Sequence, residues 1–276
     1  MVLLQGLKKT ISIRNLVSNF FNALLMKITK NIFWILSLSV LFLISCDRNK
    51  FLTKLVETSA DGSAKTTLYT YKGNEILSID GNEIHHDFVY NNGLISKIVT
   101  TDKLSQRKTT MVYTYDKKML VRAECLNEYS ISYLHNQDGT ISFEKKALNP
   151  ETKLYHGTLT FKNNNIIKEE RVIDSSAAGM VATHTLSFEY DTKKNPLHSI
   201  MGYEKLLDQS NLISLNNSVI SVVTTTETKA DQTISSANFY KNTFKYDEND
   251  YPLERVSEAV MPAKGKSYYL KSEYFY

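Results

Sequence analysis

The sequence predicts an all-β protein, in which an antiparallel up-and-down meander of repeated hairpins curves or closes into a barrel-like sheet. Aromatic or β-branched residues alternate with polar residues along many short runs, and this period of two is typical of strands with one dry face. Clusters of Asn, Asp, Gly and Lys separate the runs at a spacing of roughly 20–30 residues. The chain holds 10 glycines and 4 prolines among 276 residues, a foldable and not a disordered composition.

Seven copies of a strand–turn–strand unit follow one another along the chain. Their turn clusters are residues 72–75, 91–93, 116–118, 136–139, 162–165, 192–196 and 248–252. The runs that flank these clusters are 68–71 and 76–79, 88–90 and 94–98, 112–115 and 119–121, 131–133 and 141–143, 159–161 and 166–168, 188–191 and 197–200, and 244–247 and 253–256. Asn, Asp and Gly tolerate the positive φ of tight hairpin turns, and the flanking residue types suit a half-buried sheet.

Outside these copies, residues 201–215 have room for one or two helical turns, and residues 174–179 indicate a loop. No Pro-rich or Gly/Ser-rich linker divides residues 51–276, so we expect one antiparallel β domain there. Curling into a barrel would bury the dry face and remove the strand edges. A sandwich of two sheets is the second choice.

Residues 1–45 have the features of a secretion leader that contains a signal helix. Residues 32–44 form an apolar run of about 13 residues, shorter than the ~20 residues that a transmembrane helix needs. Lys27 and Lys30 precede this run, as basic residues do in signal peptides. Because Met26 opens a well-formed signal, we suspect that translation starts there; the alternative is a true amphipathic extension from Met1.

The apolar run ends in Leu43, Ile44, Ser45 and Cys46, which resembles the lipobox of bacterial lipoproteins. In such proteins the cysteine receives a diacylglycerol and becomes the first mature residue, so the resemblance implies lipidation of Cys46. Residues 46–50 would then be the anchor and tether, and acyl chains would attach the domain to a membrane. The alternative is an uncleaved membrane anchor.

The net charge of the predicted domain differs from that of the whole chain. Five of the 33 basic residues and none of the 29 acidic residues lie in residues 1–45. The remaining 28 basic and 29 acidic residues leave a formal charge of −1, so the basic pI of 8.7 belongs to the leader. This balance argues against a nucleic-acid partner.

The two cysteines are Cys46 and Cys125. If Cys46 carries lipid, Cys125 has no partner and a disulfide framework is excluded. Cys125 lies in a strand-like run without an electropositive setting, so we expect a small buried side chain and not a reactive thiol.

Residues 188–191 (Phe-Glu-Tyr-Asp) and 244–252 (Phe-Lys-Tyr-Asp-Glu-Asn-Asp-Tyr-Pro) resemble the tyrosine–aspartate repeat, F-x-Y-D-x-x-G-x-[PL]. Together with the closing run, residues 268–276, they make the chain similar to uncharacterised Bacteroidota YD-repeat-like lipoproteins, whose predicted fold is a porin-like or lipocalin-like antiparallel β structure. Asp250 stands where the repeat has Gly, and the first copies lack Asp after Tyr. The resemblance brings no catalytic residues.

Glu83, His85 and Asp87 alternate on one strand face and are weak candidates for metal ligands. The opposite face is the apolar one, so we expect these three side chains in solvent and His86 in the core. The sequence contains no G-x-S-x-G, P-loop or G-x-G-x-x-G pattern. We therefore predict no catalytic residues, no metal site and no cofactor.

These observations predict a cell-envelope lipoprotein, anchored in the outer membrane, that acts as a non-enzymatic ligand-binding or structural module. Its partners would be the membrane, through the lipid, and a small molecule or glycan in the barrel mouth. One alternative is a membrane-spanning β-barrel, which requires an outer band free of charge. Another is an envelope hydrolase acting on polymers, which requires paired carboxylates in a cleft.

Overall fold

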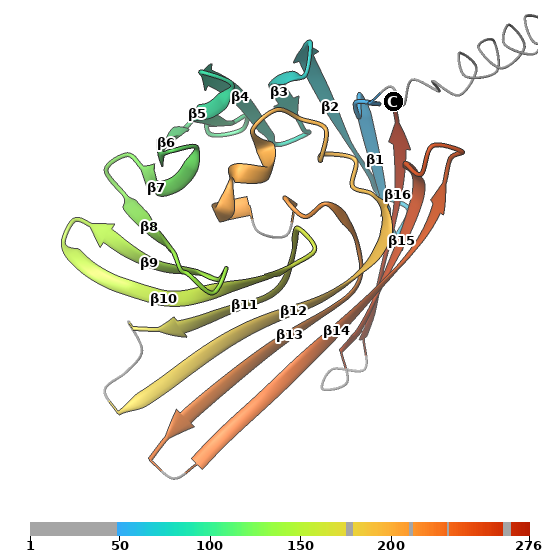
Figure 1. Ribbon diagram of the computed structural model, residues 1–276. Coiled ribbons are helices and arrows are strands. Elements are labelled where there is room, and N and C mark those ends of the chain that lie inside the picture. Colours follow the sequence, from blue (N-terminus) through green and yellow to red (C-terminus); the bar gives the residue numbers. More distant parts are fainter. Residues whose placement is uncertain (1–48, 175–178, 210–211, 231, 262–265) are drawn as a thin grey trace, which may run out of the picture. The chain divides into compact units, whose positions relative to one another are not determined.

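Sixteen antiparallel strands close into a barrel in the computed structural model (Figure 1). Each strand pairs with its neighbours in the sequence, and the first strand pairs with the last. The structure describes residues 49–174, 179–209, 212–230, 232–261 and 266–276. The barrel belongs to the compact unit Asn49–Tyr276. The closed up-and-down barrel confirms the predicted fold class, and the sandwich is not formed.

The strands of the first half are short. They are β1 (Lys54–Ser59), β2 (Ala64–Lys72), β3 (Glu75–Asp80), β4 (Ile84–Asn91), β5 (Leu94–Asp102), β6 (Lys108–Asp116), β7 (Met119–Cys125) and β8 (Tyr129–His135). Those of the second half are longer on average. They are β9 (Ile141–Leu148), β10 (Glu151–Lys162), β11 (Asn165–Ile173), β12 (Met180–Lys194), β13 (Asn216–Lys229), β14 (Gln232–Tyr246), β15 (Pro252–Met261) and β16 (Lys266–Phe275).

Six of the seven predicted hairpins form where the turn clusters placed them. Asn92, Lys117, Lys118, Asn163 and Asn164 all have positive φ, between 47° and 66°. Two-residue turns with this geometry match the right-handed twist of the strands that they join. The Asn, Gly and Lys clusters therefore specify the turns through backbone conformation.

Five of these six hairpins also contain a register shift beside an inward aromatic residue. The shifts fall next to Tyr71, Tyr90, Tyr115, Phe161 and Tyr246. Several tyrosines donate their hydroxyl hydrogen to a backbone carbonyl of a nearby strand end. The bonds run from Tyr71 to Leu52, from Tyr115 to Ile95, from Tyr190 to Ile166 and from Tyr276 to Pro252, at 2.7 to 2.9 Å. The repeated Tyr thus fastens one hairpin to another.

The prediction of a return strand at residues 197–200 is wrong. β12 and β13 pair directly, and residues 195–215 form a long connection between them. Leu197 and Ile200 are buried by this connection, which makes two short 3-10 turns, η1 (Tyr203–Lys205) and η2 (Leu207–Gln209). The expected one or two helical turns are therefore confirmed.

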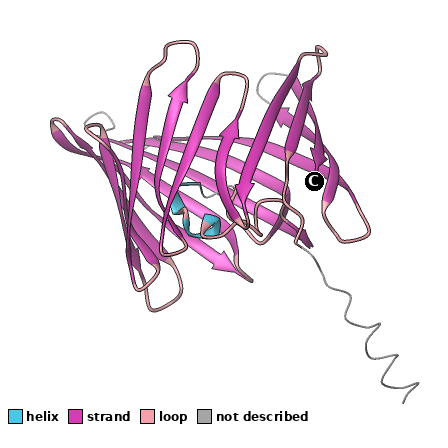
Figure 2. Cartoon of the chain, turned by 90° about the horizontal axis from the view of Figure 1, so that it is seen from above, coloured by secondary structure: helices cyan, strands magenta, loops and turns pink. Residues whose placement is uncertain are grey.

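This connection folds into the barrel interior. The helical turns lie inside the ring of strands in both views (Figures 1 and 2). The backbone N–H of Met201 donates to the carbonyl of Asn74 at 2.9 Å, and Leu215 donates to Asn164 at 3.2 Å. The connection therefore contacts the β2–β3 and β10–β11 turns at one end of the barrel. We call its described residues, 195–209 and 212–215, the plug.

Alternation along each strand separates a lumen face from an outer face. On β14, Asn242, Phe244 and Tyr246 are half-buried, whereas Lys241, Thr243 and Lys245 are exposed. The buried side chains of the lumen form one core that also includes Leu206 and other plug residues. The core therefore lies inside the barrel.

The described chain begins beside the β14–β15 turn. The Lys50 ammonium pairs with the Asp247 carboxylate at 2.6 Å, and its backbone N–H donates to the Tyr251 hydroxyl at 3.3 Å. The leader, the lipobox and Cys46 lie outside the described residues, as does most of the predicted loop at 174–179. No helix within the described residues is both long and apolar enough to cross a bilayer.

Candidate functional site

A cavity of about 560 Å³ lies in the lumen, between the strands and the plug. Its size falls within the range of roughly 300–1,000 Å³ that small-molecule sites occupy. Strands β1 to β6 supply one wall, the plug supplies a second, and β12 to β16 supply a third. The cavity is the candidate binding site.

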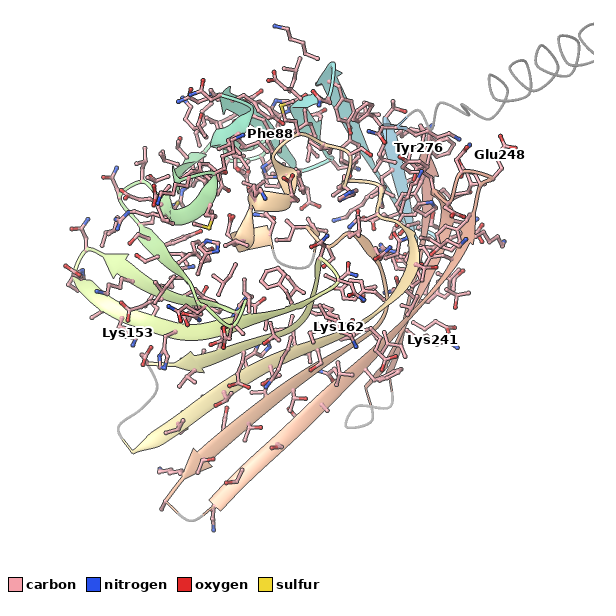
Figure 3. All side chains as sticks on the ribbon, in the orientation of Figure 1. Phe88, Lys153, Lys162, Lys241, Glu248 and Tyr276 are labelled. Atoms are coloured by element: carbon pink, nitrogen blue, oxygen red, sulfur yellow. The ribbon has the colours of Figure 1, made fainter. Side chains whose placement is uncertain are left out.

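The wall made by the early strands and the plug is apolar. Leu55, Phe88, Ile98 and Met111 line it from the strands, and Leu206 lines it from the plug. Phe88 lies near the Tyr203 ring, with 6.5 Å between the ring centroids (Figure 3). This wall suits a hydrocarbon chain or a ring system, because apolar surface buried against it leaves water.

The wall made by the late strands is polar. The Arg255 guanidinium donates to Glu57 at 3.2 Å and to the Ser272 hydroxyl at 2.9 Å. The Ser257 hydroxyl donates to the Asn242 side-chain carbonyl at 2.5 Å. A ligand in the cavity would therefore meet hydrogen-bonding groups on one side and hydrocarbon on the other.

A buried carboxyl group joins the plug to the barrel. The Tyr113 hydroxyl donates to Oδ2 of Asp208 at 2.9 Å, while Oδ1 of Asp208 has no hydrogen-bond partner. Burial raises the pKa of Asp208, and hydrogen bonds from Tyr113 and Gln209 oppose that shift only in part. Burial next to this carboxyl also raises the pKa of Tyr113. Burial thus disfavours the charged form of Asp208 relative to an exposed carboxyl group.

The outer face of the barrel carries ion pairs. Lys153 and Lys241 point away from the ring of strands (Figure 3). Glu254 pairs with Lys245 at 2.7 Å and with Lys271 at 3.0 Å, across three neighbouring strands. Further pairs join Arg122 to Glu124 at 2.8 Å, Lys146 to Glu144 at 3.2 Å and Lys168 to Glu170 at 2.5 Å. The outer face of these strands therefore carries paired charges.

The candidate metal ligands lie on this outer face and have other partners. Both ring nitrogens of His85 face carboxylates, Nδ1 with Asp80 at 2.6 Å and Nε2 with Asp87 at 3.1 Å. The hydrogen bond to Asp80 is the main cause that raises the pKa of His85, and a protonated ring cannot bind a metal. Glu83 pairs with Lys65 at 2.9 Å. Among the described residues, no three His, Cys, Asp or Glu side chains form a metal site.

Two further residues lie where the sequence placed them. His86 faces the lumen and bonds the Thr100 hydroxyl at 2.9 Å, and burial lowers the pKa of His86. Cys125 is buried, and burial raises the pKa of its thiol. The structure thus places His86 on the lumen side and Cys125 among the buried residues, as the alternation predicts.

The polar groups of the lumen were not predicted. Glu57 and Arg255 each lie in a run whose inward positions can be read from the alternation, whereas Asp208 lies in the plug, outside any such run. However, alternation alone does not show that strands 200 residues apart meet, and Glu57 meets Arg255 only because β1 pairs with β16. Barrel closure, and no local motif, brings them together.

Two solved structures similar to this chain are those of porin-like proteins. No protein-family model and no curated protein matches the chain. Among solved structures, a porin-like protein from Bacteroides vulgatus ATCC 8482 is 13% identical, with a TM-score of 0.49, and the match covers 82% of this chain and 98% of that one. A porin-like protein from Bacteroides uniformis ATCC 8492 is 10% identical, with a TM-score of 0.48 and coverage of 83% and 98%. Neither a ligand nor a relation to a membrane follows from likeness at this level.

Proposed function

We propose that this protein is a non-enzymatic envelope lipoprotein whose barrel stands in water and holds a small, partly apolar molecule in its lumen. A lipid on Cys46 would tether it to the outer membrane. The single observation that carries the proposal is the polarity of the two faces: the outer face carries ion pairs, and the inner face holds the apolar core and the cavity.

This polarity is the reverse of what a lipid-facing barrel needs. A membrane-spanning barrel has an apolar outer band, and each Lys or Arg at the bilayer midplane costs about 2–4 kcal/mol. Arg122, Lys146 and Lys168 lie on outer positions well inside their strands. The sixteen-stranded closed barrel by itself is compatible with a membrane-spanning protein, but the outer charges favour an aqueous setting.

Strand length supports the same proposal. A strand needs about 9–11 residues to cross a bilayer at the usual tilt. β1 and β3 have 6 residues each, and β7 and β8 have 7 each. A continuous apolar belt around the barrel would have to include these strands.

The setting of the barrel can be tested with a chain that begins at Asn49. We expect it to be monomeric in buffer without detergent and to remain at the bottom of a density gradient when mixed with phospholipid vesicles. A membrane-spanning barrel would instead need detergent and would float with the vesicles, and that outcome would overturn the proposal.

The anchor can be tested separately in cells grown with an alkyne analogue of palmitate. The full chain and the Cys125→Ser variant are expected to take up label, and the Cys46→Ser variant is expected to take up none. Equal labelling of the Cys46→Ser variant would refute lipidation at this cysteine and leave the binding proposal standing.

The hydrolase alternative finds less support in the cavity. It requires two carboxyl groups that face one substrate. Among the described residues that line the cavity, Glu57 is the one carboxylate, and Arg255 and Ser272 already bond it. An arrangement of this kind positions a polar group and does not supply an acid and a base.

A further inference from the structure

Lys145 is a lumen-facing lysine on β9. It pairs in register with Ile131 of β8 and with Tyr155 of β10, both inward residues. Its neighbours Glu144 and Lys146 face outward and pair with each other at 3.2 Å. Lys145 therefore points into the barrel, where it is half-buried.

Aromatic rings, and not carboxylates, surround the Lys145 ammonium. Its Nζ lies 3.5 Å from the centroid of the Tyr129 ring and 5.6 Å from that of Tyr155. The Arg171 guanidinium lies on the same Tyr155 ring, at 5.3 Å. Among the described residues, no carboxylate lies within ion-pair distance of Lys145. Ring contacts of this kind stabilise a cation by roughly 0.5–2 kcal/mol without cancelling its charge.

The carboxyl groups near Lys145 have other partners. Glu169 pairs with Arg171. Glu128 pairs with Arg107 at 2.5 Å, and Asp208 accepts the hydroxyl hydrogen of Tyr113 at 2.9 Å. Burial, followed by the charge of Arg171, lowers the pKa of Lys145. An added anion would relieve both effects.

The remaining titratable neighbours add no negative charge. Burial lowers the pKa of His184, which pairs in register with Arg171, so this ring favours its neutral form. The raised pKa of the Cys125 thiol likewise favours the neutral thiol.

Two side chains, Tyr129 and Met111, connect Lys145 to the cavity, which Lys145 itself does not line. The Tyr129 ring contacts the Lys145 ammonium. The Tyr129 hydroxyl donates its hydrogen to the sulfur of Met111 at 3.7 Å. Met111 lines the apolar wall. A ligand whose hydrocarbon part fills the cavity along this wall would bring a polar end group toward Lys145.

We propose that the lumen binds an amphipathic carboxylate, with its apolar chain in the cavity and its head group on Lys145. This inference rests on the proposed function, since it names the class of ligand for the same cavity. Arg255 is a weaker choice for the head group because Glu57 already balances its charge. Lys145 offers a partly desolvated cation without such a partner, where an ionic hydrogen bond is stronger than at the surface.

The test uses chain Asn49–Tyr276, which contains every strand of the closed barrel. The probes are 11-(dansylamino)undecanoic acid and its methyl ester, whose chains match and whose head groups differ in charge. We expect fluorescence titration to give at least tenfold tighter binding of the acid, since an ionic hydrogen bond contributes about 1.5–3 kcal/mol.

The variants separate this inference from the binding proposal. Lys145→Gln is expected to weaken acid binding about tenfold and to leave ester binding unchanged. Lys145→Arg should retain the preference for the acid. Lys146→Gln, the matched control on the outer face, should bind both probes as the parent does.

Each other outcome has one meaning. Equal affinity of the parent chain for acid and ester would overturn the anion inference and keep the cavity as a binding site. Equal weakening of both probes by Lys145→Gln would show a structural role and would also overturn it. Failure of the parent chain to bind either probe would count against the proposed function itself.

Discussion

Gly157 on β10 lies where a backbone and a ring approach the lumen wall together. A Cβ atom at this position would stand 1.9 Å from the Glu170 carbonyl oxygen and 2.6 Å from Cζ of Phe143. Both neighbours belong to strands that pair with β10. The absent side chain therefore allows the Phe143 ring to lie across β10 and contribute to the core.

Gly157→Ala is expected to destabilise the protein by about 1–3 kcal/mol, because the Glu170 backbone must move to admit the methyl group. Urea denaturation of the chain Asn49–Tyr276 measures the change. Gly81→Ala is the control, since its nearest contacts would be ordinary ones at 3.4 and 3.7 Å. Similar losses for the two variants would contradict this account of Gly157.

Asp208 makes stability depend on pH in a defined direction. Its folded pKa is raised above the unfolded value of 3.8, chiefly by burial. Its contribution is therefore complete below pH 3.8 and is lost as the pH rises through the folded pKa. Asp208→Asn keeps an acceptor for Tyr113 and cannot ionise, so it should reduce the loss of stability as the pH rises above 3.8. Parallel pH profiles for parent and variant, from urea denaturation, would refute this.

At the scale of the elements, the hairpin is the repeated unit, and the tyrosine after the register shift joins one unit to another. Tyr115 shows the arrangement: its hydroxyl donates to the Ile95 carbonyl at 2.8 Å, 20 residues earlier in the chain. Asp247 adds a second device in the last copy, because its Oδ1 accepts the backbone N–H groups of Asn249 and Tyr251. Asp247 after Tyr246 thus stabilises a longer turn, whereas Asp116 after Tyr115 precedes a two-residue turn formed by Lys117 and Lys118.

Tyr115→Phe removes one of these hydroxyl bonds and is expected to lower the free energy of unfolding by about 0.5–1.5 kcal/mol. Tyr269→Phe serves as the matched control, because this tyrosine is exposed and lies on the outer face of β16. Thermal unfolding followed by circular dichroism compares the two. An effect of Tyr269→Phe as large as that of Tyr115→Phe would show that the bond contributes nothing.

The sequence predicts the hairpins well because alternation and turn chemistry are local properties. It fails at residues 197–200, where the apolar Leu197 and Ile200 follow a turn cluster as a return strand would but enter the core from the plug. The burial of apolar residues is the same in both cases, and only contacts with distant turns, such as that of Met201 with Asn74, distinguish them. The lumen pair Glu57 and Arg255 escapes prediction for the same reason.

At the scale of the whole molecule, one seam completes the barrel. β1 and β16 pair over the six positions from Lys54 with Phe275 to Ser59 with Leu270. Without this seam the first and last strands would expose unpaired backbone groups, which promote association with other chains. Every strand inside the closed barrel has two neighbours.

A chain Asn49–Met261, which lacks β16, is therefore expected to aggregate. Size-exclusion chromatography should place it near the void volume, whereas the chain Asn49–Tyr276 should elute as a monomer. Monomeric elution of the shortened chain with an unchanged β-type circular-dichroism spectrum would show that the seam is dispensable.

The strands differ greatly in length, and the ends of the longest strands are expected to open locally. β12, β13 and β14 have 14 or 15 residues, and the far ends of β13 and β14 pair Thr225 with Ser236 on one face and Thr226 with Ser235 on the other. Hydroxyl groups lie on both faces of these strand ends, so little hydrophobic free energy opposes the separation of β13 from β14 there. The amide protons at the far ends of β13 and β14 should exchange with deuterium well before those around Ile76 and Ile95. These strand ends can therefore open while the part of the barrel that contains the plug stays folded.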